Sequence, residues 1–521
     1  MAEEFIRKDE LANEITRPGL LRNQPLYRQK GKRFTENLAG YAMLAKPGTP
    51  EVWMNMLPDV HRLDKAQLVM LIEEKLIPRE GGIQCLRALK EMEKDGEEGI
   101  KKARAEAGAG IFSGENYLIP RLGEAVGGLI HLGRSTGDET TGTLRMAIRS
   151  EIIEILQKAI DYRETLVKVA EQHIETPFPT YTGFQAAQIT SLAHYLLDFI
   201  YKAGHACKKL GDDYKEVNRS PMGAAIGTGS DFPLNRERVA ELLGFDSVIT
   251  NTHEAISSED KTFMIEVFGT LTLLLAPVEK LAAYMFFFHS TELGFVLAAD
   301  RFCDTSSIMP QKRNPFLMYN VAAKVHGVYS AFFEDILEET ALICWPRGAT
   351  IKRAFADTKD ALECGRLNIG TMKINKKRIL ENLQFNWCCA TDLAGALVRK
   401  HKLSWRTAYQ IVAIICRKAE ENNIPSSALN NQMIEDASKE HMGKKLSLSK
   451  ATIKSVQDPM ERINARTLTG GPSPDNVRKM IQEVKQGIEE DKTFVKTTRQ
   501  KLVDADRKLD KAVNKLLKAY P

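Results

Sequence analysis

The chain has 521 residues, 43% of them hydrophobic and 27% charged, an ordinary composition for a soluble globular protein that excludes disordered and fibrous classes. Its 73 basic and 68 acidic residues leave a net charge of +5, too even a balance to indicate a nucleic-acid partner. Eight cysteines without CxxC spacing indicate neither a zinc site nor a disulfide framework, so we expect no metal and reduced thiols.

The N-terminal part, residues 1–133, is predicted to be a domain of shorter helices and loops. Its first 19 residues are charged throughout and lack the apolar core of a signal peptide, so we expect a cytoplasmic location. The segment KDGEEGIKKARAEAGAG within this domain is typical of a flexible or surface stretch.

Residues 134–375 are predicted to form a central domain built as a bundle of long helices. Apolar residues recur every four positions in its first run, at Leu144, Ile148, Ile152, Leu156 and Ile160. This spacing puts them on one face of a helix long enough to cross a large molecule. Short segments rich in proline and glycine, such as ETPFPTYTG, join the long helices and favour a bundle.

The most apolar segment of the chain is VFGTLTLLLAPVEKLAAYMFFFH, within the same domain. A membrane-spanning helix needs about 18 or more uninterrupted apolar residues. Pro277, Glu279 and Lys280 interrupt this segment, so a buried bundle helix is favoured and no membrane association is expected.

Residues 376–475 are predicted to be a small helical domain, and residues 476–521 a Lys-rich amphipathic helical extension. One face of the extension carries Leu502, Ala505, Leu509, Val513 and Leu516. Acidic residues interleaved with the lysines favour packing on the body or on a partner subunit over contact with nucleic acid. Strand-like alternation is scarce throughout, so the expected fold class is all-α.

The stretch DRFCDTSSIMPQKRNPFLMYN, from Asp300 to Asn320, interrupts the helices with two serines followed by fixed cations. One interpretation is a capped helix start with solvated charges. The other is a loop that grips an anion, in which a serine activated by backbone N–H groups removes a proton from carbon. Lys312 and Asn314 are suitable donors to the negative charge that would develop on an adjacent carboxylate.

Within this stretch, SSIMPQKRNP closely resembles GSSxMPxKxN, the signature loop of the fumarase/aspartase superfamily, and is most similar to the argininosuccinate lyase branch. IHLGRSTGDETTGTLR resembles the first substrate segment of that branch, and TYTGFQAAQ resembles its second. Further landmarks are similar in RSPMGAAIGTGSDFPLNRERVAELLGFDSVITNTHEAIS, ATDLAGALVRKHKLSWRTAYQIV and ARTLTGGPSPDNVRKMI. The resemblance spans about Arg33 to Ile481.

The resemblance implies a three-domain, almost entirely helical protein with a long central bundle. It implies a homotetramer in which each active site collects segments from three subunits, with no metal or organic cofactor. The implied reaction is a reversible anti-elimination that breaks a C–N bond and releases fumarate. By position, Ser306 takes the place of the base. The residues expected to bind substrate are Lys312, Asn314, Ser135, Thr136, Thr182 and Gln185.

Several residues depart from the pattern of this branch. In the first substrate segment, Thr136 and Gly137 stand where the branch has Arg and Asn. In the second, Gly183 stands where the branch has His. In and after the signature loop, Thr305 replaces Gly, Phe316 replaces Asp, and Tyr319 stands where the branch has the Glu that partners this His. The loss of the His together with its Glu is physically coherent, because a buried carboxylate without a partner is costly. The same loss removes the group expected to help protonate the leaving nitrogen.

We therefore predict an argininosuccinate-lyase-like C–N lyase that releases fumarate from an N-substituted aspartate, argininosuccinate itself or a related N-succinyl amine or amino acid. Two alternatives remain open. In one, the chain is a non-catalytic binding or structural homologue of the lyase fold. In the other, it is a lyase for a different amino-polycarboxylate.

Overall fold

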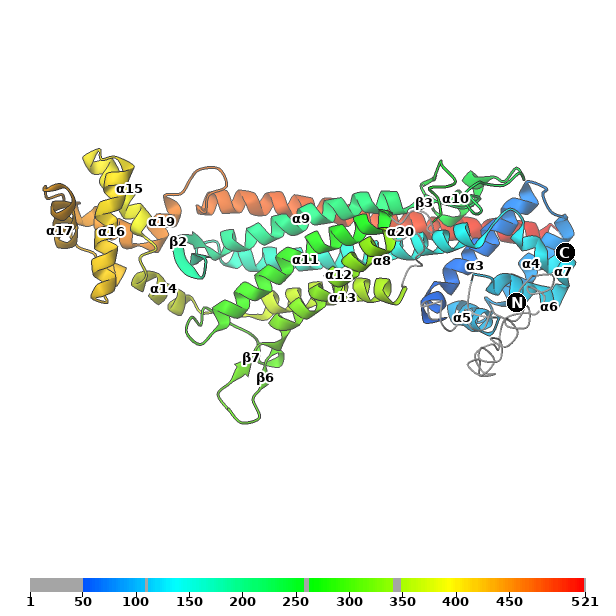
Figure 1. The fold of residues 1–521 in the computed structure, drawn as a ribbon, viewed down its shortest axis with the longest axis horizontal. Helices are drawn as coiled ribbons and strands as arrows, with labels where there is room; N and C mark the ends of the chain where they lie inside the picture. The colour runs from blue at the N-terminus through cyan, green and yellow to red at the C-terminus, as the bar shows by residue number, and fades with distance from the viewer. Residues whose placement is uncertain (1–49, 108–110, 257–261, 341–347, 520–521) are drawn as a thin grey trace, which may run out of the picture.

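The computed structural model describes residues 50–107, 111–256, 262–340 and 348–519. The part of the first predicted domain up to residue 49 therefore lies outside the described residues, as does Cys344. The described chain is an elongated assembly of helices (Figure 1). The predicted all-α class is confirmed.

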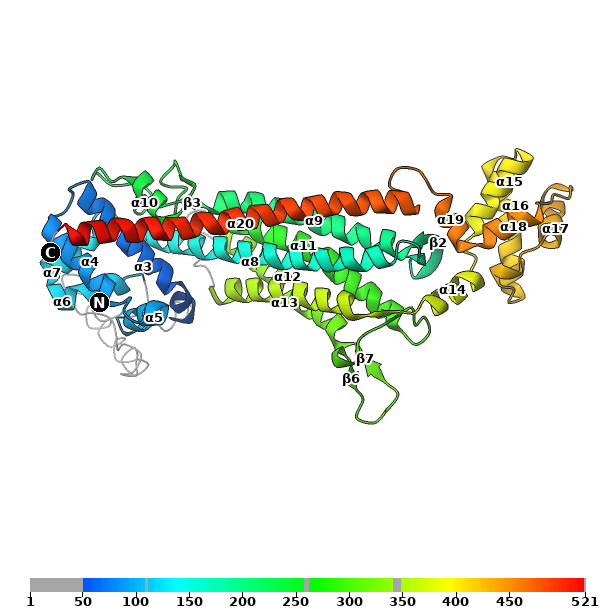
Figure 2. The ribbon, with the colours of Figure 1, turned by 180° about the vertical axis from the view of Figure 1, so that it is seen from behind.

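Within the described part of the chain, six long helices form the body and lie side by side in both views (Figures 1 and 2). They are α8 (Thr136–Gln172), α9 (Leu192–Val217), α11 (Thr262–His289), α12 (Phe316–Thr340), α13 (Gly348–Thr371) and α20 (Pro474–Lys518). The five apolar residues that recur every four positions along α8 are all buried. Their burial against neighbouring helices is what stabilises a helix of this length.

Further helices, most of them shorter than those of the body, gather at one end of the bundle around a second apolar core (Figure 1). These are α3 (Pro50–Glu73), α4 (Arg79–Glu91), α5 (Gly96–Glu106), α6 (Ser113–Leu122), α7 (Glu124–Gly127), η2 (Gly128–His131) and α10 (Arg236–Leu243). Leu509 and Val513, from the last turns of α20, belong to the same core. The C-terminal helix thus ties this end to the bundle.

A second group of short helices lies at the opposite end of the bundle (Figures 1 and 2). It comprises α14 (Lys376–Phe385), α15 (Ala390–His401), α16 (Trp405–Glu421), η4 (Ser426–Ala428), α17 (Asn431–Met442), α18 (Lys450–Gln457) and α19 (Pro459–Asn464). From here the chain returns along α8 and α9 as α20. The residue boundaries proposed for the four domains stay predictions.

The strands are short and form pairs. β1 (Pro177–Thr182) pairs antiparallel with β2 (Gln185–Ser191), and β3 (Arg219–Ser220) pairs parallel with β4 (Ser247–Val248). β5 (Val296–Leu297) pairs with β8 (Lys373–Ile374), next to η3 (Asp300–Phe302). β6 (Asp304–Thr305) pairs antiparallel with β7 (Arg313–Asn314) and forms a hairpin that projects from the side of the bundle (Figure 1).

α11 contains the predicted bundle helix and is, by length and composition alone, the one candidate membrane span among the described residues. Half of its most apolar window is buried inside this chain. It packs against α9, α12 and α13, so its apolar composition contributes to the bundle core. Leu273 and Phe286 remain about half exposed on its outer face.

Candidate active site

The first predicted substrate segment lies where α8 begins. Ser135 is the N-cap of α8, with an extended backbone at φ −137° and ψ 169°, and Thr136 is the first helical residue. The backbone N–H of Ser135 donates to Oδ1 of Asp138 at 2.8 Å. Both predicted residues are half-buried, so this turn presents them at a fixed helix end.

Asp138 also joins this turn to the loop after β3. Its Oδ2 accepts hydrogen bonds from the backbone N–H groups of Gly223 at 3.0 Å and Ala225 at 3.2 Å. Burial raises the pKa of Asp138 to about 6, although these N–H donors oppose the rise. The prediction did not include Asp138, but a serine followed three residues later by an acidic residue is a capping pattern that could have identified it.

Arg134 and Glu139 continue the buried network below this turn. Nη1 of Arg134 binds Asp64 at 2.8 Å, and its Nε lies 3.2 Å from Oε1 of Glu139. Asp64 also accepts from Arg104 at 2.7 Å. Burial raises the pKa of Glu139 to about 8, because the charge of Arg134 offsets it only in part. For Asp64 the two guanidinium groups outweigh burial, so its pKa is lowered.

Gly137 has a steric reason to be glycine. A Cβ at this position would lie 3.1 Å from the carbonyl oxygen of Ala225 and 3.3 Å from a methyl carbon of Ile256. The loop that Asp138 holds therefore packs directly on Gly137. The larger residue of the related pattern would require this loop to move.

The second predicted segment is the tip of the β1–β2 hairpin. Thr182 and Gln185 face each other across the two-residue turn formed by Gly183 and Phe184. Both turn residues have positive φ angles, 55° and 60°, the pattern of a type I′ turn. All four residues are exposed, and the centroid of the Phe184 ring lies 5.0 Å from that of Phe287.

Ser306, Lys312 and Asn314 lie on the projecting β6–β7 hairpin. The Oγ of Ser306 accepts hydrogen bonds from the backbone N–H groups of Ile308 at 3.3 Å and Met309 at 3.0 Å. Asn314 stands on β7 directly opposite Asp304, and Lys312 is exposed near the tip. Two N–H donors aimed at one hydroxyl oxygen stabilise negative charge on it, which is what a serine acting as a base requires.

The three predicted segments are not brought together within one chain. α8 has 37 residues and separates the Ser135 turn from the hairpin that carries Thr182. At 1.5 Å per residue this helix is roughly 55 Å long. The β6–β7 hairpin projects from the bundle between these two ends (Figure 1). Each segment is ordered locally, but a site containing all seven predicted residues requires further copies of the chain.

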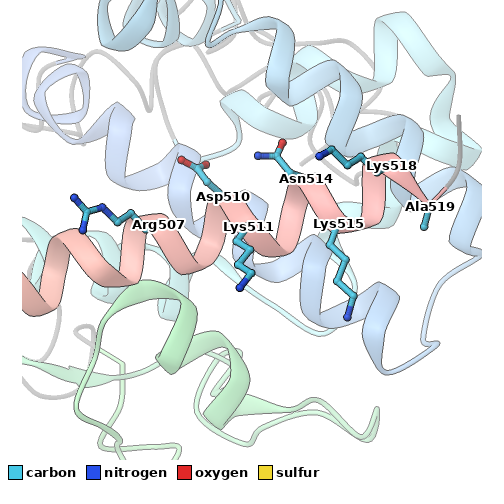
Figure 3. A pocket seen from close by; sticks show the side chains of 7 residues that line it. All are labelled: Arg507, Asp510, Lys511, Asn514, Lys515, Lys518 and Ala519. Atoms are coloured by element: carbon cyan, nitrogen blue, oxygen red, sulfur yellow. The ribbon is translucent and has the colours of Figure 1, made fainter.

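A separate hollow of about 810 Å³ lies beside the last turns of α20 (Figure 3). Its lining residues come from this one helix, and Lys511 and Lys515 point to one side while Asp510 and Asn514 point to the other. Asp510 is already paired with Lys65 at 3.0 Å. The side chains do not converge, and none of the predicted site residues lies here. Among the described residues, no group of three or more His, Cys, Asp or Glu side chains is arranged to hold a metal ion.

Two family matches cover most of the described chain. Residues 79–328 match a lyase family, and residues 387–463 match the C-terminal part of argininosuccinate lyase. The argininosuccinate lyase of Methanosphaera stadtmanae is 30% identical over 437 residues, which cover 81% of this chain and 91% of that protein. The chain belongs to the argininosuccinate lyase family. It is accordingly an argininosuccinate-lyase-like carbon–nitrogen lyase, as predicted.

Other comparisons agree with this family. The argininosuccinate lyase of Methanocaldococcus jannaschii is 31% identical over 439 residues, covering 82% of this chain and 87% of that protein. The fold is similar to that of EDDS lyase solved with formate, with a TM-score of 0.83. That structure is 24% identical, and the match covers 89% of this chain and 93% of that one. The predicted fumarase/aspartase-type fold is therefore confirmed.

Proposed function

We propose that this lyase releases fumarate from an N-substituted aspartate by anti-elimination, with Ser306 as the base. The observation that carries the proposal is the pair of backbone N–H donors on Ser306 Oγ. These donors favour the ionised hydroxyl, which can then remove the proton on the carbon beside a carboxylate. Because a carbanion at that carbon is stabilised as the aci form of the carboxylate, the cation of Lys312 and the amide of Asn314 bind this carboxylate.

We further propose that the enzyme is a homotetramer with shared active sites. The separation of the three segments along α8 supports this, because one chain cannot bring them within reach of a small substrate. That the assembly has four subunits, and that three of them contribute to each site, is inferred from the family resemblance. Ser135 and Thr136 of one subunit, and Thr182 and Gln185 of another, would then face the hairpin of a third.

The outer faces of α11 and α12 support the same assembly. Apart from Asn320, the exposed residues of α12 whose side chains are described repeat at alternate spacings of four and three: Tyr319, Ala323, His326, Ser330, Phe333 and Leu337. This is the spacing of helices that pack side by side in coiled coils. Phe333 and Leu337 are 63% and 68% exposed in the single chain, and Leu273 on α11 is 54% exposed. Large apolar side chains left exposed in a row favour burial against a second copy of the chain.

The substrate is proposed to be an N-succinyl amine or amino acid, or another amino-polycarboxylate, whose amine half carries its own leaving-group proton. Position 183 has no side chain, and its positive φ suits the glycine. A Cβ there would meet no atom of the described chain within 4 Å, so crowding does not explain the residue. Without a histidine at this position, an easily expelled amine is favoured over one that needs an enzymic acid.

The enzyme is proposed to act in amino-acid metabolism in the cytoplasm, on small molecules and without a nucleic-acid or membrane partner or a cofactor. All seven cysteines among the described residues are free thiols, which suits a reducing compartment.

The test of the reaction is fumarate release, followed by its absorbance, from argininosuccinate and a panel of N-succinylated amines. We expect Ser306→Ala to lower kcat by about 10³-fold with the best substrate, because a positioned base typically contributes that much. The matched control is Ser307→Ala, which changes the adjacent exposed serine. A wild-type rate in Ser306→Ala would overturn the assignment of the base, and no release from any compound would overturn the proposed reaction.

The shared site is tested by mixing two inactive variants. Ser306→Ala and Thr182→Ala, co-expressed, should form some sites with neither change if the two residues come from different subunits. Activity should then return to a fraction of the wild-type value, with a tetrameric mass by light scattering. If the mixture stays as inactive as each variant alone, the shared site is wrong.

A further inference from the structure

Tyr319 forms a hydrogen bond across the base of the β6–β7 hairpin. It lies in the first turn of α12, and its hydroxyl donates to Oδ2 of Asp304 at 3.2 Å. Tyr319 is one of the residues that depart from the family pattern, and in this chain its hydroxyl is paired with Asp304. The bond joins the bundle helix to the strand that enters the hairpin.

Asp304 is placed to influence two of the predicted site residues. Asp304 is two residues before Ser306, which directly follows β6, and its Cα is paired with that of Asn314 on β7. A shift of Asp304 relative to α12 therefore moves the base and one carboxylate-binding residue together. Reaction rates fall steeply with such shifts, by as much as about 100-fold for 1 Å.

The other strand of the hairpin has a separate anchor. Arg313 on β7 binds the carboxylate of Asp300, and its Nη2 donates to the carbonyl oxygen of Ala298 at 3.0 Å. Apart from the half-buried Ser306, the residues between the two anchors, including Ile308 and Met309, are exposed. The entering strand is therefore fixed through Tyr319 and the leaving strand through Arg313.

We propose that Tyr319 and Asp304 form a latch that positions Ser306 for proton removal. This inference rests on the proposed function, since it concerns the orientation of the proposed base. Tyr319 is a positioning residue that acts through Asp304, and the latch controls kcat more than substrate binding. Lys312 is adjacent to Arg313, whose anchor does not depend on the latch.

The geometry argues against Tyr319 as the missing proton donor. Its O–H already donates to the carboxylate of Asp304, so the proton is directed at the hairpin strand. Partial desolvation of the ring hydroxyl and this bond raise the pKa of Tyr319 above its ordinary value, which makes it a weaker acid. A hydroxyl in this state holds its partner in place better than it supplies a proton.

A double-mutant cycle tests the latch. Tyr319→Phe removes only the hydroxyl, and Asp304→Ala removes only the acceptor. We expect each to lower kcat by about tenfold with KM changed less than about twofold, and the double variant to match the single ones, because all three lose the same bond. Asp304→Asn keeps an acceptor oxygen and should stay within about threefold of wild type. Tyr409→Phe, which changes a tyrosine of similar exposure on α16, is the control and should not change kcat.

Three outcomes would overturn the latch. The first is a wild-type kcat in Tyr319→Phe. The second is a loss of kcat in the double variant equal to the product of the two single losses. The third is a loss of kcat in one single variant far greater than in the other. Hydrogen exchange of the amides in residues 304–314 provides a readout that needs no substrate. Exchange should quicken in Tyr319→Phe and Asp304→Ala but not in Asp304→Asn. Unchanged exchange overturns the latch even if no substrate is found, whereas faster exchange without fumarate release overturns only the proposed reaction.

Discussion

The Ser135 turn and the β6–β7 hairpin are both expected to contact substrate, and the chain holds them in opposite ways. Behind the turn, Arg134, Asp138 and Glu139 are almost completely buried in a network of ion pairs and hydrogen bonds. The hairpin is exposed, with Ile308 82% accessible, and each of its strands is anchored through one side-chain residue, Tyr319 or Arg313. A buried network makes the segment with the predicted binding residues rigid before substrate arrives, whereas few contacts leave the segment with the proposed base free to adjust.

The largest effect is expected from breaking the network behind the Ser135 turn. Arg104 is fully buried and binds both Asp64, at 2.7 Å, and Ser113, at 2.9 Å. Arg104→Met keeps the volume but leaves part of the buried Asp64 charge without a partner. We expect the free energy of unfolding to fall by about 3–5 kcal/mol, measured by urea denaturation at a fixed protomer concentration.

Lys101→Met on the same helix is the matched control. Lys101 pairs with Glu97 and Glu98 at the surface, so its loss should leave the urea midpoint unchanged. If Arg104→Met is as stable as this control, the buried network does not hold the turn, and the contrast with the hairpin disappears.

The contrast also explains what the sequence could predict. The bundle follows from apolar spacing, and the regularly spaced residues of α8, from Leu144 to Ile160, are buried as expected. Of the five tail residues predicted to share one packing face, Ala505, Leu509 and Val513 are buried, and Leu502 and Leu516 are half-buried. Such patterns are local and periodic, so a single sequence contains them.

The connections within the candidate site were not predicted. Asp304 pairs with Asn314, 10 positions away, and accepts a hydrogen bond from Tyr319, 15 positions away. The strands β6 and β7 have two residues each, too few to show the alternation of polar and apolar residues that predicts a strand. Asp64 contacts Arg134 across 70 positions, which no local pattern encodes. The roles of the seven site residues stay predictions, because the three segments lie apart within one chain.

A smaller effect is expected from the titration of the same network. Burial raises the pKa of Glu139 to about 8 from an ordinary value of 4.5. The folded chain therefore retains a proton that the unfolded chain releases, and stability should fall as pH rises from about 5 to 8. The glutamine side chain of Glu139→Gln has no proton to release, so we expect its urea midpoint to fall less than that of wild type between about pH 5 and 8.

The pKa of Asp138 is raised to about 6, so its ionisation lowers the stability of both wild type and Glu139→Gln over a lower pH range. Glu154→Gln on the same helix is the control, since Glu154 is exposed and pairs with Arg499 at 2.8 Å. It should keep the wild-type slope. Equal slopes in Glu139→Gln and wild type would mean that Glu139 is ionised throughout, paired with Arg134 rather than neutral.

The smallest effect on stability is expected at the hairpin. Arg313→Ala removes the contacts to Asp300 and to the carbonyl of Ala298, but the Asp300 side chain is 91% exposed and its loss of a partner leaves no buried charge. We expect an unchanged urea midpoint together with cleavage between residues 306 and 313 that is a few times faster under limited proteolysis, because the leaving strand loses its anchor. A lowered midpoint without faster cleavage would mean that Arg313 supports the bundle and that the hairpin is as firmly held as the Ser135 turn.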